Sequence, residues 1–337
     1  MSTVLVTGAS SFLGYHVAKR LNEQGIRPRV LELRGSRLEP LDRLDVERVP
    51  GDLDSADAIS RACAGVETIL HLAFKVSVGG GQETLDEMER INVGGTERLL
   101  DLAAAQGVSR AVVAGSALAV GVNREPAALD ENASWSDHGF DFPYALNRRK
   151  AEQAALDRAK PGFAVVVVCP AFTLGPDDPV GAPANALIKA LITNKLWITL
   201  PVGFGVLDVR DFANAAILAA ERGRSGQRYL ISGHNVTTSQ LLQEAAGVAG
   251  VRAPRIVPPM MLLSAAVRAL GLFSRVKGKP APVTPSVLQI VNRFAWYDTT
   301  RARTDLGWEP RPLRQTLEDT IRSLRAGPPA SGTAAVS

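Results

Sequence analysis

The stretch Thr7-Gly8-Ala9-Ser10-Ser11-Phe12-Leu13-Gly14 decides the predicted fold. A short apolar and β-branched run over residues 2–7 precedes it, as in a buried strand, and apolar residues at helical spacing follow over 12–21. A strand, a glycine loop and a helix in this order present the free N–H groups of a helix start, where a dinucleotide pyrophosphate binds. The sequence therefore predicts a dinucleotide-binding unit at the start of the chain.

The two glycines of this loop have different expected roles, and the residue between them departs from the usual pattern. Gly8 allows a tight turn, and Gly14 allows the helix to pack closely on the strand. Ser11 stands where the pattern usually has a middle glycine, so its side chain must point away from the phosphates or hydrogen-bond to them. The order of strand, loop and helix around the motif makes it a specific signal for dinucleotide binding.

The end of the second predicted strand, residues 29–33, carries the signals that separate NAD from NADP. Glu32 falls where a carboxylate accepts hydrogen bonds from the adenosine ribose hydroxyls, which favours NAD. Arg34 and Arg37 follow it and can instead meet a 2′-phosphate. We favour NAD because a carboxylate repels that phosphate, and NADP stays open as the alternative.

The third and fourth predicted strands bring further residues toward the cofactor. Asp52 follows the third strand and is expected to accept a hydrogen bond from the adenine amino group. The fourth strand covers residues 68–72, and Ala73 and Phe74 then lead the chain past the cofactor. For His71 we expect a packed histidine satisfied by the backbone rather than a catalytic group.

A serine and a tyrosine are the predicted catalytic pair. Ser116 lies at the end of a fifth strand over residues 110–115, and Tyr144 opens a helix over 144–158. Ligands of open α/β sheets bind beyond the carboxyl ends of the strands. Ser116 is therefore expected to hydrogen-bond and polarise a substrate carbonyl, while the Tyr144 phenol donates or accepts the proton.

Arg148 is the predicted cation of this site. It follows Tyr144 by four residues and so lies on the same helix face, whereas Lys150 is rotated off that face. A nearby cation favours a phenolate, so Arg148 is expected to lower the pKa of Tyr144 and to hydrogen-bond the nicotinamide ribose. Arginine stays charged and cannot relay a proton as lysine can. The competing interpretation of residues 147–150 is a solvated basic face.

These residues resemble those of the extended short-chain dehydrogenase/reductase family, in its NAD-dependent epimerase/dehydratase and dihydroflavonol-reductase-like branch. The resemblance covers about residues 1–325, and further matching segments are Gly51-Asp52-Leu53, His71-Leu72-Ala73, Asn92-Val93-Gly94-Gly95-Thr96 and Asp208-Val209-Arg210-Asp211. It implies an α/β fold with a Rossmann-type doubly wound parallel sheet and a smaller C-terminal substrate domain. The catalytic serine, tyrosine and lysine of the family map onto Ser116, Tyr144 and Arg148, and its active-site asparagine maps onto Asn92. Ser11 and Arg148 depart from the family pattern.

Two sets of binding residues follow, and no metal ligands are predicted. The cofactor is expected to contact Gly8, Ser10, Ser11, Phe12, Leu13, Gly14, Glu32, Arg34, Asp52, Leu53, Leu72, Ala73, Phe74, Tyr144, Arg148, Pro170 and Phe172. The substrate is expected to contact Phe74, Val76, Ser116, Ala117, Phe142, Tyr144 and Phe172.

The predicted substrate is a ketone or secondary alcohol on a fairly apolar small molecule. Nucleotide-sugar epimerases of the family usually carry an Arg-Asp-Phe segment before a late valine-rich strand, and residues 203–208 contain no arginine. An apolar mouth suits a carbon skeleton better than a sugar diphosphate. The side chains expected at this mouth are Phe74, Val76, Phe140, Phe142 and Phe172. A nucleotide-sugar epimerase or dehydratase is the first alternative, and a cofactor-binding sensor or partner protein with weakened catalysis is the second.

Strand and helix patterns alternate up to the sixth strand, 165–169, and then change. We expect a dinucleotide-binding domain over residues 1–172, to which 204–232 returns, and a smaller substrate domain mainly within 173–325. Residues 326–337 are expected to form a disordered tail.

The apolar stretch 258–273 is too short to span a bilayer. We rank three interpretations of it: a buried helix first, a lid over the substrate second, and a surface anchor third. Amphipathic helices over 87–106 and 144–158 are compatible with a homodimer or a monomer.

Composition excludes several classes of protein. The chain has 337 residues, 46% hydrophobic and 21% charged, as in globular proteins. Its formal net charge is only +4 with acidic and basic residues interleaved, so no nucleic-acid partner is expected. Cys63 and Cys169 are expected to be buried thiols rather than a disulfide. No signal peptide is recognised at the N-terminus, which predicts a cytoplasmic protein.

Overall fold

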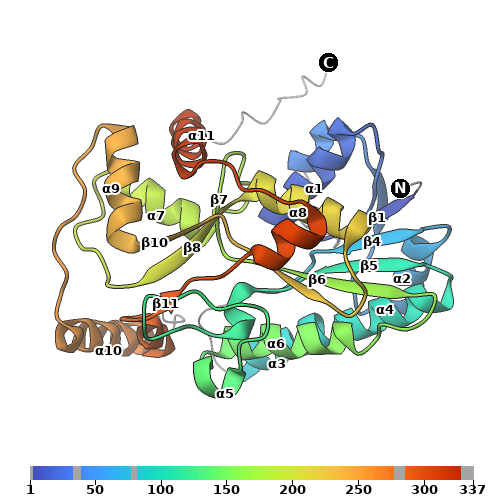
Figure 1. Ribbon diagram of the computed structural model, residues 1–337, viewed down its shortest axis with the longest axis horizontal. Coiled ribbons are helices and arrows are strands. Elements are labelled where there is room, and N and C mark those ends of the chain that lie inside the picture. The colour runs from blue at the N-terminus through green and yellow to red at the C-terminus, as the bar shows by residue number, and fades with distance from the viewer. Residues whose placement is uncertain (1–2, 33–38, 77–81, 277–284, 328–337) are drawn as a thin grey trace.

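A seven-stranded parallel sheet forms the centre of the larger lobe (Figure 1). The computed structural model describes residues 3–32, 39–76, 82–276 and 285–327. In spatial order the strands are β3 (Glu47–Pro50), β2 (Arg29–Glu32), β1 (Val4–Thr7), β4 (Thr68–His71), β5 (Arg110–Ala114), β6 (Ala164–Pro170) and β9 (Arg228–Ile231). The strand order reverses between β1 and β4, as in a doubly wound sheet, and confirms the predicted fold class.

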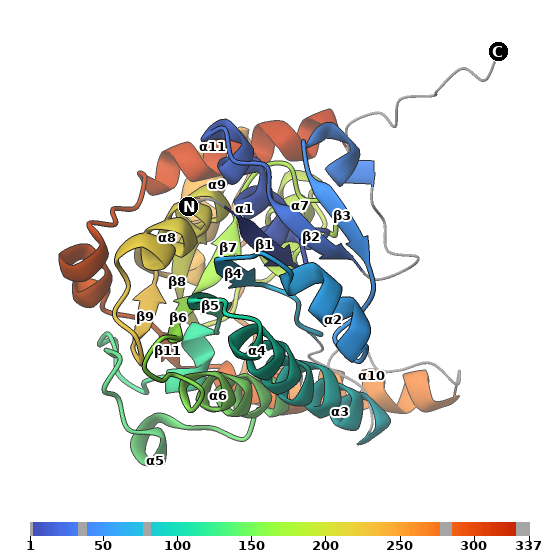
Figure 2. The ribbon, with the colours of Figure 1, turned by 90° about the vertical axis from the view of Figure 1, so that its right-hand side faces the viewer.

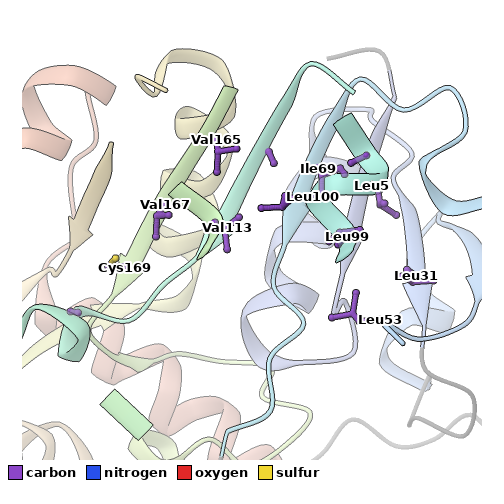
Figure 3. Packing of buried hydrophobic residues seen from close by; sticks show 14 of the residues in the cluster. Leu5, Leu31, Leu53, Ile69, Leu99, Leu100, Val113, Val165, Val167 and Cys169 are labelled. Carbon is purple, nitrogen blue, oxygen red and sulfur yellow. The ribbon is translucent and has the colours of Figure 1, made fainter. Parts of the chain in front are cut away.

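Helices cover both faces of this sheet (Figure 2). On one face α1 (Phe12–Glu23) packs against α8 (Val209–Arg222), and on the other α2 (Ala56–Cys63), α4 (Gly95–Ala105) and α6 (Pro143–Leu156) lie side by side. Successive strand residues point to opposite faces. Leu5, Ile69, Val113 and Val167 accordingly join the cluster under α4 (Figure 3), whereas Val4 and Val6 join the cluster under α8.

A second, smaller sheet lies beside the first. Its central strand β8 (Gly203–Asp208) pairs with β10 (His234–Thr237), β11 (Phe294–Ala295) and β7 (Phe172–Leu174). The helices α7 (Pro183–Ile192), α9 (Thr238–Ala249) and α11 (Leu313–Ala326) pack together over it. Because β8 belongs to this sheet, the chain returns to the larger lobe with α8 at residue 209, and not at 204 as predicted.

One predicted helix is interrupted at a position that matters for the site. Instead of a continuous helix over 87–106, the chain forms α3 (Gln82–Met88), a π-helical segment η2 (Glu89–Gly94) and α4. Such wide turns rotate the side chains that follow them and are frequent at functional sites. The remaining short helices are η1 (Glu39–Arg43), η3 (Ala117–Val120), α5 (Trp135–His138), η4 (Pro285–Ile290) and η5 (Ala302–Leu306).

The structure also bears on the predictions for the two cysteines, the apolar stretch and the C-terminal tail. Cys63 and Cys169 are both buried and free, as predicted. The apolar stretch 258–273 forms part of α10 (Met260–Val276), but none of the side chains described over 260–269 is buried, so the expected buried helix is wrong. Of the predicted tail, Ala326 ends α11, and residues 328–337 lie outside the described residues.

The segment Asp208-Val209-Arg210-Asp211 connects the two lobes. The Asp208 carboxylate caps α8 by accepting a hydrogen bond from the backbone N–H of Arg210 at 2.8 Å. Asp211 accepts from the backbone N–H of Arg311 at 2.8 Å, which ties α8 to the chain entering α11. These acidic residues therefore hold the start of α8 in place between the sheets.

Candidate active site

The glycine loop between β1 and α1 is packed too tightly for any side chain at its two ends. Gly8 has φ +71°, and a Cβ atom there would lie 2.7 Å from the backbone of Ala73. A Cβ atom on Gly14 would lie 2.0 Å from the carbonyl oxygen of Gly8. The structure thus confirms the tight turn at Gly8 and the close helix–strand packing at Gly14.

Ser11 is the N-cap of α1. Its hydroxyl oxygen accepts a hydrogen bond from the backbone N–H of Gly14 at 3.1 Å, and its own N–H donates to the carbonyl of Gly8 at 3.0 Å. The side chain thus turns back onto the helix. The first N–H groups of a helix have no partner within it, so those of Phe12 and Leu13 remain suited to an anionic group.

A buried hydrogen-bond chain fixes the ends of β1 and β4. Thr96 donates to the carbonyl oxygen of Asn92 at 2.6 Å, so it accepts from Nε2 of His71 at 3.0 Å. Nδ1 of His71 then accepts from the hydroxyl of Thr7 at 2.7 Å. Burial lowers the pKa of His71 to about 3, which keeps the ring neutral. His71 is therefore a packed histidine as predicted, but its partners are two hydroxyl groups rather than the backbone.

The side chain of Asn92 is fully engaged within the protein. Its Oδ1 accepts from the backbone N–H of Lys75 at 2.8 Å, and its Nδ2 donates to the carbonyl of Lys75 at 2.9 Å and to Oδ1 of Asn147 at 2.7 Å. Asn92 lies in the π-helical segment and is completely buried. Through these bonds Asn92 connects the segment after β4 to helix α6. Its side chain therefore holds these two elements in position.

Arg148 is buried at the carboxyl end of β5. Its Nη2 donates to the carbonyl oxygens of Ala114 at 2.5 Å and Gly115 at 2.7 Å, and its Cζ lies 3.6 Å from the centre of the Phe74 ring. Nε and Nη1 are buried, and no hydrogen-bond partner for either lies within the described residues. Buried donors without partners are rare and costly, so these N–H groups mark a place for an acceptor that is not part of the chain.

Burial and neighbouring groups act on Arg148 in opposite directions. Burial lowers the pKa of the guanidinium, while the Tyr144, Cys169 and Glu152 side chains favour its charged form. Arginine remains protonated in proteins under such conditions. A permanent positive charge is thus held beside the Tyr144 phenol on the same face of α6.

Ser116 and Tyr144 lie on adjoining elements. Ser116 follows β5 and starts η3, which packs against α6, and Tyr144 stands in the first turn of α6. The Tyr144 ring is half-buried and meets the edge of Phe142 at a centroid distance of 6.1 Å. No hydrogen bond of either hydroxyl is formed within the described residues. Their predicted catalytic roles remain predictions.

The side chains of the predicted apolar mouth differ in their burial and contacts. Phe140 and Phe142 are buried in the core and stack on each other at 5.6 Å, and Ala117 is also buried. Phe172 stacks on Phe204 of the second sheet at 4.6 Å. Phe74 lies under Arg148. Spacing along the sequence cannot distinguish a loop phenylalanine that turns inward from one that lines a pocket.

The remaining predicted cofactor residues lie near the carboxyl ends of the strands. Glu32 ends β2 and is buried, and Pro170 ends β6. Asp52 accepts hydrogen bonds at Oδ1 from the backbone N–H groups of Asp54 and Ser55, each at 3.0 Å, and so shapes the turn before α2. Leu53 and Leu72 are buried, Ala73 and Val76 follow β4, and Arg34 and Arg37 lie outside the described residues.

Sequence reasoning missed a buried group behind Arg148. The carboxylate of Glu152 pairs with Nε of Arg228 at 2.6 Å and accepts from the Cys169 thiol at 3.6 Å. Burial raises the pKa of Glu152, although the positive charge of Arg228 acts to lower it. A Cβ atom on Gly115 would lie 2.6 Å from the Cys169 sulfur, so this cluster fixes the turn before Ser116. The four-residue spacing from Arg148 to Glu152 is the signal that could have revealed it.

The comparisons with known proteins show the family of the chain. The model of the NAD dependent epimerase/dehydratase family matches residues 4–232. The chain belongs to this family. Its relatives include oxidoreductases of the extended short-chain dehydrogenase/reductase class, and the sheet described above is the Rossmann-type fold.

Three relatives span nearly the whole chain. Sterol demethylase protein B of Methylococcus capsulatus is 31% identical over 327 residues, covering 96% of this chain and 98% of that one. The 4-hydroxy-2-methyl-3-oxo-4-farnesyl-3,4-dihydroquinoline-1-oxide ketoreductase of Stigmatella aurantiaca is 28% identical over 335 residues, covering 97% of each. The crystal structure of gox2253 is 28% identical, covers 97% of this chain and 99% of that one, and superimposes with a TM-score of 0.83.

Proposed function

We propose that the chain is an NAD(P)-dependent oxidoreductase that interconverts a ketone and a secondary alcohol on a fairly apolar small molecule. The observation that carries the proposal is Arg148, which is buried beside Tyr144 and fixed on two backbone carbonyls, while its Nε and Nη1 have no hydrogen-bond partner in the described part of the chain. An acceptor-rich ligand such as the nicotinamide ribose satisfies these groups. The family description supports a nicotinamide cofactor at this place.

The residues at the strand ends fit such a cofactor. The start of α1 takes the pyrophosphate on its free backbone N–H groups, in a loop whose tight packing requires Gly8 and Gly14. Glu32, at the end of β2, takes the adenosine ribose hydroxyls, and its negative charge favours NAD over NADP. When bound, the cofactor donates or accepts a hydride.

The chain itself handles the proton and orients the substrate. The Ser116 hydroxyl donates a hydrogen bond to the substrate oxygen, and the Tyr144 hydroxyl gives a proton to that oxygen or takes one from it. Arg148 places its positive charge next to the Tyr144 phenol. Because a guanidinium keeps its protons, Arg148 acts by charge and hydrogen bonding alone.

The relatives support an apolar substrate. One is named for a sterol and one for a farnesyl-substituted quinoline ketone, which are carbon skeletons without a sugar diphosphate. The absence of arginine from residues 203–208 points the same way. Both features favour a carbon-skeleton ketone over a nucleotide sugar.

A substrate panel tests the proposal. The protein is incubated with NADH or NADPH and either apolar cyclic ketones or UDP-glucose, the cofactor absorbance is followed, and products are identified by mass spectrometry. We expect oxidation of NADH with ketones and an alcohol product two mass units heavier. Conversion of UDP-glucose without net cofactor oxidation would favour an epimerase, and tight NADH binding without turnover of any compound would favour a cofactor-binding protein.

A further inference from the structure

An apolar helix at the edge of the smaller lobe has no buried side chain in its described part. Over residues 260–269 of α10, the exposed side chains include Met261 at 79%, Leu262 at 57% and Met260 at 37%. Figure 1 shows α10 at the periphery, and both ribbon views place it on the same side of the molecule as α3 and α6. Apolar helices of globular proteins normally bury their apolar stripe. Among the described elements, η4 packs against α10, and the side chains described over 260–269 stay exposed or half-buried.

A neighbouring loop extends the exposed surface. Thr199 donates a backbone hydrogen bond to the carbonyl of Ile256 at 2.9 Å, so the segment with Ile198 runs beside the segment that leads into α10. Together these segments form an apolar ridge consisting of Trp197, Ile198, Ile256, Val257, Met260, Met261 and Leu262. These are seven of the nine large hydrophobic side chains that are exposed in the described part of the chain, so the exposure is concentrated and not scattered.

The segments that carry this ridge contain basic but no acidic side chains. Residues 179–207 and 245–297 contain no aspartate or glutamate, although the chain as a whole has 34 acidic and 38 basic residues. The exposed basic side chains of these segments next to the ridge are Lys195, Arg252, Arg255 and Arg268. None of them forms an ion pair within the described residues. The ridge is therefore an apolar surface whose own segments add four positive charges that are not paired within the described residues.

We propose that the apolar ridge docks the protein onto an anionic phospholipid bilayer. Tryptophan and aliphatic side chains enter the interface between water and acyl chains, while lysine and arginine meet the phosphate headgroups. A two-fold contact between copies would bring the same cations of both chains together, which disfavours self-association through this face. No helix in the described residues has the length and apolar character needed to cross a bilayer, so α10 lies along the surface. This inference does not depend on the proposed reaction.

Vesicle sedimentation tests the proposal directly. The purified protein is mixed with vesicles of phosphatidylcholine alone or of 70:30 phosphatidylcholine and phosphatidylglycerol, at low and at high salt. We expect at least about tenfold tighter binding to the anionic vesicles and a loss of most of that binding at high salt, since each basic residue near the surface contributes about fivefold. Equal binding to both vesicles, or binding to neither, would overturn the proposal.

Matched variants distinguish binding through the ridge from nonspecific adsorption to vesicles. Trp197→Glu with Met261→Glu removes the apolar contact, and Arg252→Glu with Arg255→Glu reverses the charge. Val180→Glu changes a valine that is 60% exposed outside the ridge and serves as the control. We expect both double variants to lose vesicle binding at least tenfold with unchanged thermal unfolding midpoints, and the control to bind like wild type. A wild-type dimer that Trp197→Glu with Met261→Glu dissociates, without vesicle binding by wild type, would make the ridge an interface between copies and overturn the proposal.

Discussion

The guanidinium group of Arg148 lies over the ring of Phe74, with 3.6 Å between its Cζ atom and the ring centre. Phe74 comes from the loop after β4 and Arg148 from α6, while the carbonyls that hold Nη2 belong to the end of β5. Three elements thus fix the plane of one side chain. A lysine ammonium has no plane to be fixed in this way, so the arginine makes the site more rigid than the family's usual lysine would.

Removing the Phe74 ring should weaken cofactor binding. Phe74→Ala takes away a cation–π contact worth about 0.5–2 kcal/mol, so we expect the NADH dissociation constant to rise about two- to thirtyfold. Phe74→Tyr keeps the face of the ring and should bind like wild type. Fluorescence titration measures both, and unchanged affinity in Phe74→Ala would show that the stacking does not position Arg148.

Charge and shape at Arg148 can be separated by two substitutions. Arg148→Met leaves the buried carbonyls of Ala114 and Gly115 without their donor, which should cost about 1–3 kcal/mol in the free energy of unfolding and abolish turnover. Arg148→Lys retains a cation and should keep part of the stability and part of the turnover. Denaturant titration and steady-state kinetics distinguish the two variants, and full activity in Arg148→Met would exclude a role for the cation.

Two glycine-to-alanine substitutions should change stability in opposite directions. At Gly14 the added methyl group would lie 2.0 Å from the Gly8 carbonyl oxygen, and we expect a loss of about 1–3 kcal/mol together with weaker NADH binding. At Gly247 in α9 nothing lies within 4 Å, so alanine should stabilise the helix by about 0.5–1 kcal/mol. A Gly14→Ala protein as stable as wild type would contradict the packing described for the loop.

The sequence carries enough information to predict the larger lobe but less of the smaller one. Strand and helix alternate with short connections up to β6, and the glycine loop marks where the sheet starts, so Val4–Thr7 and its neighbours could be placed. The membership of β8 in the second sheet depends on pairing with β10 and β11, which lie 26 or more residues away along the chain. Such long-range pairings leave no local pattern.

The sequence could propose candidate site residues but not the contacts that they make. Position along the strands placed Ser116 and Tyr144 on neighbouring elements. The π-helical turns that seat Asn92 and the inward turn of Phe142 depend on packing, which a single sequence does not encode in any short window. Likewise, the periodicity of α10 shows an apolar helix, but only the structure shows that none of its side chains described over 260–269 is buried.

The buried, neutral ring of His71 should make the protein sensitive to mild acid. The unfolded chain protonates His71 below about pH 6.5, whereas the folded chain does so only near its lowered pKa of about 3. The stabilisation is therefore complete above pH 6.5 and is lost as the pH falls through this window, by about 2 kcal/mol at pH 5. Denaturant titrations at pH 7.5 and 5 should show this loss in wild type and less of it in His71→Gln. An identical pH dependence in the two proteins would argue against a neutral buried ring.

The most direct measurement of the proposed chemistry compares Tyr144→Phe with wild type in two assays, NADH binding and ketone reduction. Loss of the phenol removes the group that exchanges the proton but leaves Arg148 and the glycine loop intact. We expect the NADH dissociation constant to stay within about threefold of wild type, while kcat falls by about 10²–10⁴. Reduction of the ketone by Tyr144→Phe at the wild-type rate would contradict the assignment of this hydroxyl as the catalytic acid and base.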